Sequence, residues 1–210
     1  MPALKNVGTC FVCNENISHR MISKHITKCL EARKIFIHPN EKDRVFIIKI
    51  YAGKLFWLYV AINGDCKLEM LDAFLRRTWL ECCGHLSSFS IHGENYDCDG
   101  GMNKVIQRLF RLGTMFNYEY DFGSTTELKG EVVSIYPGKM EKNVQMIARN
   151  DFPDLTCSSC SQKPNLICSI CLDPFCKKCS KKDKCDSGYD YMLPVVNSPR
   201  MGVCGYTGQD

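Results

Sequence analysis

The sequence has no apolar run that approaches the roughly 20 residues a membrane-spanning helix requires, so we expect no insertion into a membrane. No apolar run follows residues 1–6, so we also expect no signal peptide. A chain without either feature is expected in the cytoplasm. In that reducing compartment cysteines rarely form disulfides, and paired cysteines are typical of metal ligands.

The sequence also lacks the residue patterns of common enzyme classes. No glycine-rich loop or catalytic-loop motif accompanies the tripeptide Asp121-Phe122-Gly123, which excludes a protein kinase, and there is no serine-recombinase or integrase pattern. Scattered polar residues such as His85, Asp97 and Asp121 follow no spacing that would force them together. We therefore assign no catalytic residue and favour a non-enzymatic protein, with a hydrolase-like activity of the central region as an alternative.

Charge is balanced over most of the chain. The net charge of +4 comes from residues 1–34, which hold six Lys/Arg against two Asp/Glu. This surplus permits contact with nucleic acid but does not argue for it, so an accessory nucleic-acid-binding protein of mobile-element or defence context stays an alternative. A cluster of five lysines offers either a phosphate-contacting patch or charge compensation for thiolates, and we favour the second: Lys177, Lys178, Lys181, Lys182 and Lys184.

Cysteine, in contrast, is abundant, with 15 in 210 residues. Seven lie between Cys157 and Cys185, six of them as three CxxC pairs. A CxxC pair places two thiolates on one tight turn, close enough to share a tetrahedral zinc ion. The second and third pairs are too close in sequence to belong to separate fingers, so we expect interleaved pairing. The first and third pairs then form one zinc site: Cys157, Cys160, Cys176 and Cys179.

The middle pair, Cys168 and Cys171, needs two more ligands, and Cys185 supplies one. The last is either Cys204, the better donor although distant in sequence, or Asp183, which is close but offers a less usual oxygen donor; we favour Cys204. The spacing of the first six cysteines resembles the cross-braced zinc modules of the MYND and B-box type. That resemblance implies a module for protein interaction rather than catalysis.

A third zinc site is predicted near the N-terminus, with the spacing C-x2-C-x11-H-x3-C. Its ligands are Cys10, Cys13, His25 and Cys29. The last two are four residues apart on a predicted helix over residues 21–33, which puts them on one helical face. The stretch resembles the ubiquitin-binding zinc finger of DNA-repair ubiquitin ligases, with Thr27 where that family commonly has an acidic residue that touches ubiquitin.

The central region reads as an α+β domain. Apolar runs on either side of Ala52-Gly53-Lys54 predict a hairpin over residues 45–62, and an apolar stripe predicts a helix over 68–83. A strand over 85–93, a helix with Asn103 as N-cap, a hairpin over 115–136 and a strand over 144–150 follow. The order ββαβαβββ favours a mixed or antiparallel sheet with the two helices on one face.

Two segments of this region, WLECCGHLSSFSI and FNYEYDFGSTTEL, resemble the plasmid Ri ORF-three-like family, also called transposon-passenger TnpR-like proteins. The resemblance spans residues 44–150, and the closing LPVVNSPRMGVCGYTG resembles an archaeal branch of that family. Many members continue the motif as YDFGDxWxH, whereas this chain has Ser124, Thr126 and Leu128 at the Asp, Trp and His positions. A catalytic or metal-binding role of that Asp/His pair is therefore not expected here.

The sequence thus predicts three parts: a zinc finger over residues 1–34, an α+β domain over 35–150, and a cysteine-rich zinc module with an extended tail over 151–210. We expect three zinc ions per chain. The function that these parts favour is that of a zinc-binding adaptor that acts through contacts with a protein partner.

Overall fold

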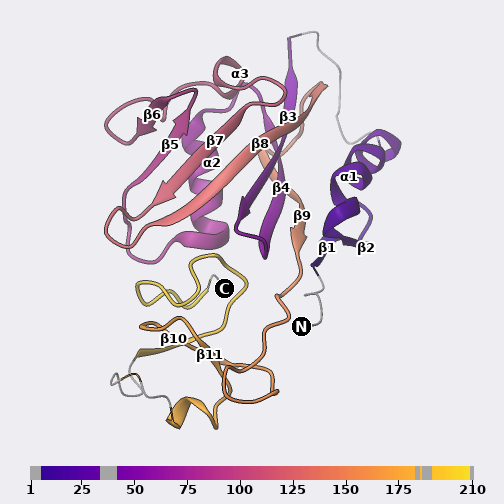
Figure 1. Ribbon diagram of the computed structural model, residues 1–210. Coiled ribbons are helices and arrows are strands. Elements are labelled where there is room, and N and C mark those ends of the chain that lie inside the picture. Colours follow the sequence, from indigo (N-terminus) through magenta and orange to yellow (C-terminus); the bar gives the residue numbers. More distant parts are fainter. Residues whose placement is uncertain (1–5, 34–41, 183–184, 186–190, 209–210) are drawn as a thin grey trace.

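The computed structural model describes residues 6–33, 42–182, 185 and 191–208. It shows a body built on a large β-sheet and, below it, a small module that contains β10 and β11 (Figure 1). The tail of the chain returns from this module and ends against the lower edge of the body (Figure 1). The predicted α+β class with small cysteine-rich modules is confirmed.

Among the described residues, nine strands form one antiparallel sheet in the order β2-β1-β9-β4-β3-β8-β7-β5-β6. In chain order these strands are β1 (Val7–Cys10), β2 (Asn16–Ser18), β3 (Arg44–Ala52), β4 (Phe56–Asn63), β5 (Ser87–Ile91), β6 (Glu94–Asp97), β7 (Met115–Tyr120), β8 (Thr126–Pro137) and β9 (Val144–Asn150). The sheet therefore includes strands from the N-terminal finger as well as from the central region.

Strands β3 and β4 are apolar except at Arg44, Lys49 and Asn63, as is typical of strands whose two faces are both buried. Since successive side chains of a strand point to opposite faces, Ile48 and Ile50 enter one apolar cluster while Ile47 enters another. The hairpin between the two strands turns at Gly53, whose φ of 56° suits glycine, and closes with Ala52 opposite Phe56. This hairpin is the predicted one.

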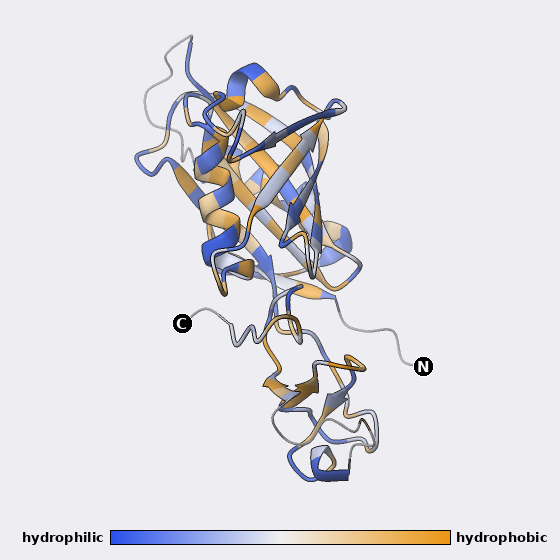
Figure 2. Cartoon of the chain, turned by 90° about the vertical axis from the view of Figure 1, so that its left-hand side faces the viewer, coloured by the Kyte–Doolittle hydropathy of each residue, from blue (hydrophilic) through white to orange (hydrophobic). Residues whose placement is uncertain are grey.

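Each face of the sheet carries a helix. Leu71 and Phe74 of α2 (Leu68–Leu75) belong to the same cluster as Ile48 and Ile50, and the short α3 (Ile106–Leu109) adds Ile106 to it. On the other face, α1 (His19–Arg33) packs its buried side chains against Ile47. Figure 2 shows the apolar residues concentrated on the strands, with hydrophilic residues on the outer surfaces of the helices.

In the central region, two predicted helices are shorter than expected and one strand was missed. In place of the helix expected over 68–83, the structure has α2, which ends at Leu75, followed by a π-helical turn over Arg76–Leu80. The residues after Leu80 form a loop. The second helix is a single turn whose N-cap is Val105, not Asn103. It ends early because Phe110 adopts an extended conformation, and its ring stacks on Phe116. The missed strand is the short, polar β6.

The N-terminal finger is continuous with the sheet. Residues Gly8 to Cys10 of β1 pair with Asn150 to Ala148 of β9, and α1 covers the same edge. The boundary expected between residues 34 and 35 lies outside the described residues. The finger nevertheless shares hydrogen bonds and an apolar cluster with the central strands, so the two parts form one folded body.

The C-terminal module has a second, three-stranded sheet in the order β11-β10-β12 among the described residues. Its elements are β10 (Leu166–Cys168), β11 (Pro174–Phe175), a 3-10 turn at Ser180–Lys182 and β12 (Met192–Pro194). The buried cluster of this module consists of Cys157, Cys168, Phe175 and Cys176. Three of these four residues are cysteines, so the module has little apolar core of its own.

The tail after β12 packs back onto the body, as expected, although it does so through successive turns rather than in an extended form. The side-chain amide of Asn150 donates to Oδ1 of Asn197, and the side-chain amide of Asn197 donates to the backbone carbonyl of Asn150. The Ser198 hydroxyl donates to the carbonyl of Trp79 at 2.6 Å. Arg200 is fully buried beneath the body. The tail is therefore part of the folded structure up to residue 208.

Replacing Gly130 by alanine tests the packing of the sheet. A Cβ at Gly130 of β8 would lie 2.0 Å from the ring of Phe116 on β7, so we expect the variant to lose about 1–3 kcal/mol of unfolding free energy. Urea denaturation measures this loss. Gly100→Ala is the matched control, because nothing lies within 4 Å of a Cβ there, and it should change stability by less than about 0.5 kcal/mol. Equal midpoints for the two variants would contradict the packing described here.

Candidate metal centres

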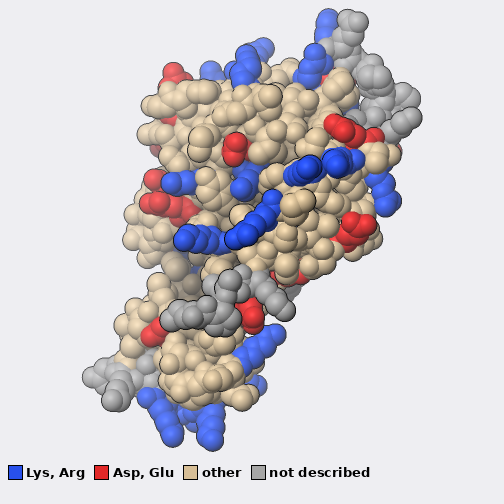
Figure 3. Space-filling model, turned by 45° about the vertical axis from the view of Figure 1, so that its right-hand side comes forward, with Lys and Arg blue, Asp and Glu red and all other residues tan. Residues whose placement is uncertain are grey.

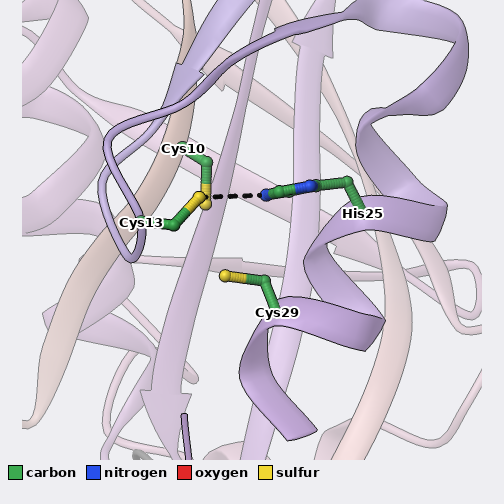
Figure 4. A group of neighbouring side chains, drawn as sticks. All are labelled: Cys10, Cys13, His25 and Cys29. Carbon is green, nitrogen blue, oxygen red and sulfur yellow. Dashed lines mark hydrogen bonds between the residues drawn. The ribbon is translucent and has the colours of Figure 1, made fainter. Parts of the chain in front are cut away.

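The predicted N-terminal ligands converge from two elements (Figure 4). Cys10 ends β1 and Cys13 lies in the turn that follows, where the N–H of Asn14 donates to the carbonyl of Cys10. His25 and Cys29 project from one face of α1, one helical turn apart. The sulfur of Cys13 lies 3.3 Å from Nε2 of His25, and the four donor atoms all lie within 4.8 Å of one another.

Without a metal ion, burial makes it unfavourable for the thiols of this N-terminal group to ionise. Cys10 is fully buried and Cys29 nearly so. Burial, together with the neighbouring thiols of Cys13 and Cys10, raises the pKa of Cys29 to about 12. A divalent cation at the centre of the group would reverse this, because a bound metal holds its thiol ligands as thiolates.

The first C-terminal group consists of Cys157, Cys160, Cys176 and Cys179, the interleaved set that the spacing predicts. Each CxxC pair lies on a similar turn, in which the N–H of the second cysteine donates to the carbonyl of the first. Burial opposes ionisation of Cys157, but N–H groups of Cys176, Ser159 and Cys160 donate to its sulfur and lower its pKa to about 6. Such N–H donors suit a thiolate bound to a metal.

Distances within this group fit zinc. Tetrahedral zinc with Zn–S bonds of about 2.3 Å places its sulfur ligands about 3.8 Å apart. The sulfur of Cys160 lies 3.8 Å from that of Cys176 and 3.6 Å from that of Cys179. A disulfide would require about 2.05 Å, and all of these cysteines are free. The sulfurs therefore have the separation of metal ligands.

The second C-terminal group brings together Cys168, Cys171 and Cys185. Asp183, one of the two residues considered for the fourth position, lies outside the described residues. Cys204, the favoured residue, lies elsewhere: the structure places its sulfur in a different group, at the edge of the body. The expectation that Cys204 completes this site is therefore corrected, because the tail carries it away from the module and back to the sheet.

A fourth group, which the sequence analysis missed, consists of Cys82, Cys83, His85 and Cys204. The sulfur of Cys204 lies 3.3 Å from Nε2 of His85. The spacing of Cys82 and Cys83 matches none of the predicted zinc sites, and His85 was among the scattered polar residues. The signal that could have revealed the site is the local pattern Cys-Cys-x-His directly after a helix, together with Cys204 as a further cysteine outside the CxxC pairs.

The remaining acidic candidates are explained by turns. Oδ1 of Asp97 accepts the N–H groups of Asp99 and Gly100, and Oδ1 of Asp121 accepts those of Gly123 and Ser124. Asp121 is thus the turn-former that its motif predicts. Its φ of 65° is in the left-handed region that aspartate tolerates better than most residues.

No family model matches the chain, and no curated protein matches it. Among solved structures, the chain is similar to a crystal structure of a protein of unknown function, MM3350, from Methanosarcina mazei Go1. The two share 17% identity over 53% of this chain and 66% of that one, with a TM-score of 0.41. The resemblance to the plasmid Ri ORF-three-like family therefore stays a prediction. No helix among the described residues is long and apolar enough to cross a membrane.

Elemental analysis of protein purified without chelator should find four zinc ions per chain, one more than the sequence predicted, because four groups of ligands converge. One zinc ion or none would contradict this assignment.

His25→Ala should remove one of these zinc ions, since the imidazole is one of four ligands of the N-terminal group. The matched control is His19→Ala on the same helix. His19 packs against Trp57, with ring centroids 5.5 Å apart, and belongs to no ligand group, so this variant should keep its full zinc content. Equal zinc content in both variants would show that His25 is not a ligand.

Proposed function

We propose that the protein is a zinc-binding adaptor that acts by contacting another protein and catalyses no reaction itself. Two features support the absence of catalysis. Three of the four groups offer four protein ligands each, and a zinc ion bound in this way has no open coordination position for a substrate. The acidic residue of the YDFG motif, Asp121, has both oxygens occupied, and its hydrogen bond from Arg200 lowers its pKa below the ordinary value, which makes it a weak base.

The observation that carries the proposal is an exposed apolar surface on the C-terminal module. Ile170 and Leu172 lie on either side of the ligand Cys171 and are 58% and 52% exposed. Tyr191, which is 51% exposed, lies beside them, because its carbonyl accepts the N–H of Ser169. Three large apolar side chains held in water at one place are typical of a surface that another protein covers.

Lysines near this surface indicate the charge of the partner. Lys177, Lys178, Lys181 and Lys182 are exposed, and basic side chains gather at the lower tip of the molecule in Figure 3. Over the upper body of the same view, acidic and basic side chains are interspersed. We therefore propose a partner segment that presents apolar and acidic side chains together.

The same lysines make nucleic acid the second candidate partner, because exposed lysines can neutralise phosphates. A gel shift that weakens steeply with salt would favour this alternative over a protein partner. We prefer the protein partner, since two of the three large exposed apolar side chains of the module, Ile170 and Leu172, are aliphatic, and a base stacks on an aromatic ring.

Two further elements of the proposal rest on the sequence. We propose that residues 44–150 belong to the plasmid Ri ORF-three-like family, with the YDFG turn as their most specific feature. We also propose a cytoplasmic location, since reduced thiols held as metal ligands suit a reducing compartment. Neither element alters the adaptor role.

An affinity capture from native lysate tests the proposal. Full-length protein should recover a specific partner, and a double variant with Ile170→Glu and Leu172→Glu should lose it, because two carboxylates would replace the apolar surface. The matched control is a double variant of the body, Leu112→Glu and Met115→Glu, at residues that are 67% and 61% exposed. This control should retain the partner.

Zinc content of both double variants should equal that of the unchanged protein, which shows that the metal centres are intact. Recovery of the same proteins by the module variant and the unchanged protein would refute the role of this surface. Recovery that depends on nuclease-sensitive material would instead support the second candidate.

A further inference from the structure

We propose that Cys82, Cys83, His85 and Cys204 bind a zinc ion that clasps the C-terminal tail to the body, so that this ion determines whether the tail stays docked. The fourth group differs from the others in its origin. His85 and Cys204 are 119 residues apart, whereas each of the other groups is drawn from one end of the chain. Zinc at this site would therefore join two segments that lie far apart in the sequence.

The body's half of the site is held in place before any metal binds. Arg76 of the π-helical turn donates to the carbonyl of His85 at 2.6 Å and pairs with Glu81 at 2.9 Å. Oε1 of Glu81 in turn accepts the N–H of Gly84 at 2.6 Å, where a φ of 71° suits glycine. These bonds fix the loop that carries Cys82, Cys83 and His85, so three of the four ligands are preorganised.

His85 is oriented as a metal-ligating histidine usually is. Its Nε2 faces Cys204, while its Nδ1 lies 3.6 Å from Oδ1 of Asp121. In zinc proteins the ring nitrogen that does not bind the metal commonly donates to a carboxylate, which fixes the tautomer and the direction of the ring. The ring also lies edge-on to Tyr120, with centroids 5.7 Å apart. Asp121 is thus a positioning residue for the site.

The tail's half of the site is anchored by Arg200, which is completely buried. Its guanidinium pairs with Asp121 at 2.6 Å, donates to the hydroxyl of Thr126 at 3.0 Å and approaches the sulfur of Cys82 at 3.3 Å. Three thiolates and one Zn²⁺ leave a net charge of about −1, and a guanidinium against one sulfur offsets it. Arg200 therefore links the buried anchor of the tail to the metal site.

The site is open to solvent even though its anchor is buried. Cys83 and Cys204 are exposed and Cys82 and His85 are half-buried, whereas the N-terminal group contains two buried cysteines. An ion at this edge can be reached by a chelator from outside. We therefore expect the fourth group to give up its zinc before the N-terminal group does.

Release of the tail would change the shape of the molecule at one place. A cavity of about 650 Å³ lies between β9 and the tail, with Arg149 and Asn150 on one wall and residues 195–198 and 206–208 on the other. Without zinc at the fourth group, fewer contacts would hold residues 195–198 and 206–208 against the body, and fewer would hold the C-terminal module to which the tail is joined. Zinc at the fourth group would thus set the position of the module.

Cys204→Ser in the full-length chain tests the inference. Elemental analysis should show the loss of one zinc ion relative to the unchanged protein, since a hydroxyl is a poor zinc ligand. Hydrogen exchange should become faster at the amides of Met201, Val203 and Tyr206, which are bonded within the turns of the tail. Cys98→Ser is the matched control, because Cys98 is exposed and belongs to no ligand group, and it should change neither measurement.

Three outcomes would overturn the inference. Full zinc content in Cys204→Ser would show that no ion binds there, and a disulfide between Cys83 and Cys204 in the purified protein would have the same meaning. Loss of zinc with unchanged exchange would show that the ion does not hold the tail. Should Cys204→Ser fail to fold, Cys83→Ser supplies the same test from the body's side. Neither measurement depends on the adaptor role, so the two proposals fail independently.

Discussion

The close approach of cysteine sulfurs from segments that lie apart in the chain is the constraint on which the rest of this structure depends. There are four groups of Cys and His side chains among the described residues, and within each group the donor atoms lie within 4.8 Å of one another. None of the cysteines is joined in a disulfide. Burial and neighbouring thiols raise the pKa of a ligand such as Cys29, and a bound cation would hold it as a thiolate. The binding energy of zinc at these groups would then contribute to folding.

This contribution matters most where apolar packing is scarce. The buried cluster of the C-terminal module is made of three cysteines and Phe175, while the body has two large apolar clusters, one on each face of its sheet. A small module of this kind does not bury enough apolar surface to fold alone. Cysteine ligands take the place of a hydrophobic core there, while apolar residues such as Ile170 and Leu172 remain exposed.

The sequence was sufficient for features that are local. CxxC turns, the four-residue spacing of His25 and Cys29 on a helix, and the hairpin of β3 and β4 all depend on neighbouring residues, and the structure contains each of them. The fourth group could not be predicted in this way. Its ligands come together because Arg200 of the tail pairs with Asp121 of the YDFG turn, and this contact requires the folded sheet.

The same reason explains the place of the N-terminal finger. Its ligand spacing predicts the site but contains no sign that β1 pairs with β9, a strand about 140 residues later. A finger whose strand pairs with the body is not an independent module, so a metal bound by its four ligands would also stabilise one edge of the sheet. The body and its N-terminal metal site are therefore one folding unit, to which the tail and the module are added.

Anomalous diffraction from crystals of the unmodified protein, recorded on both sides of the zinc absorption edge, tests the central claim most directly. The account predicts an anomalous peak at the centre of each of the four groups, with sulfur and imidazole ligands at about 2.0–2.3 Å. Continuous density between sulfurs at disulfide distance, or ordered side chains around empty centres, would contradict it.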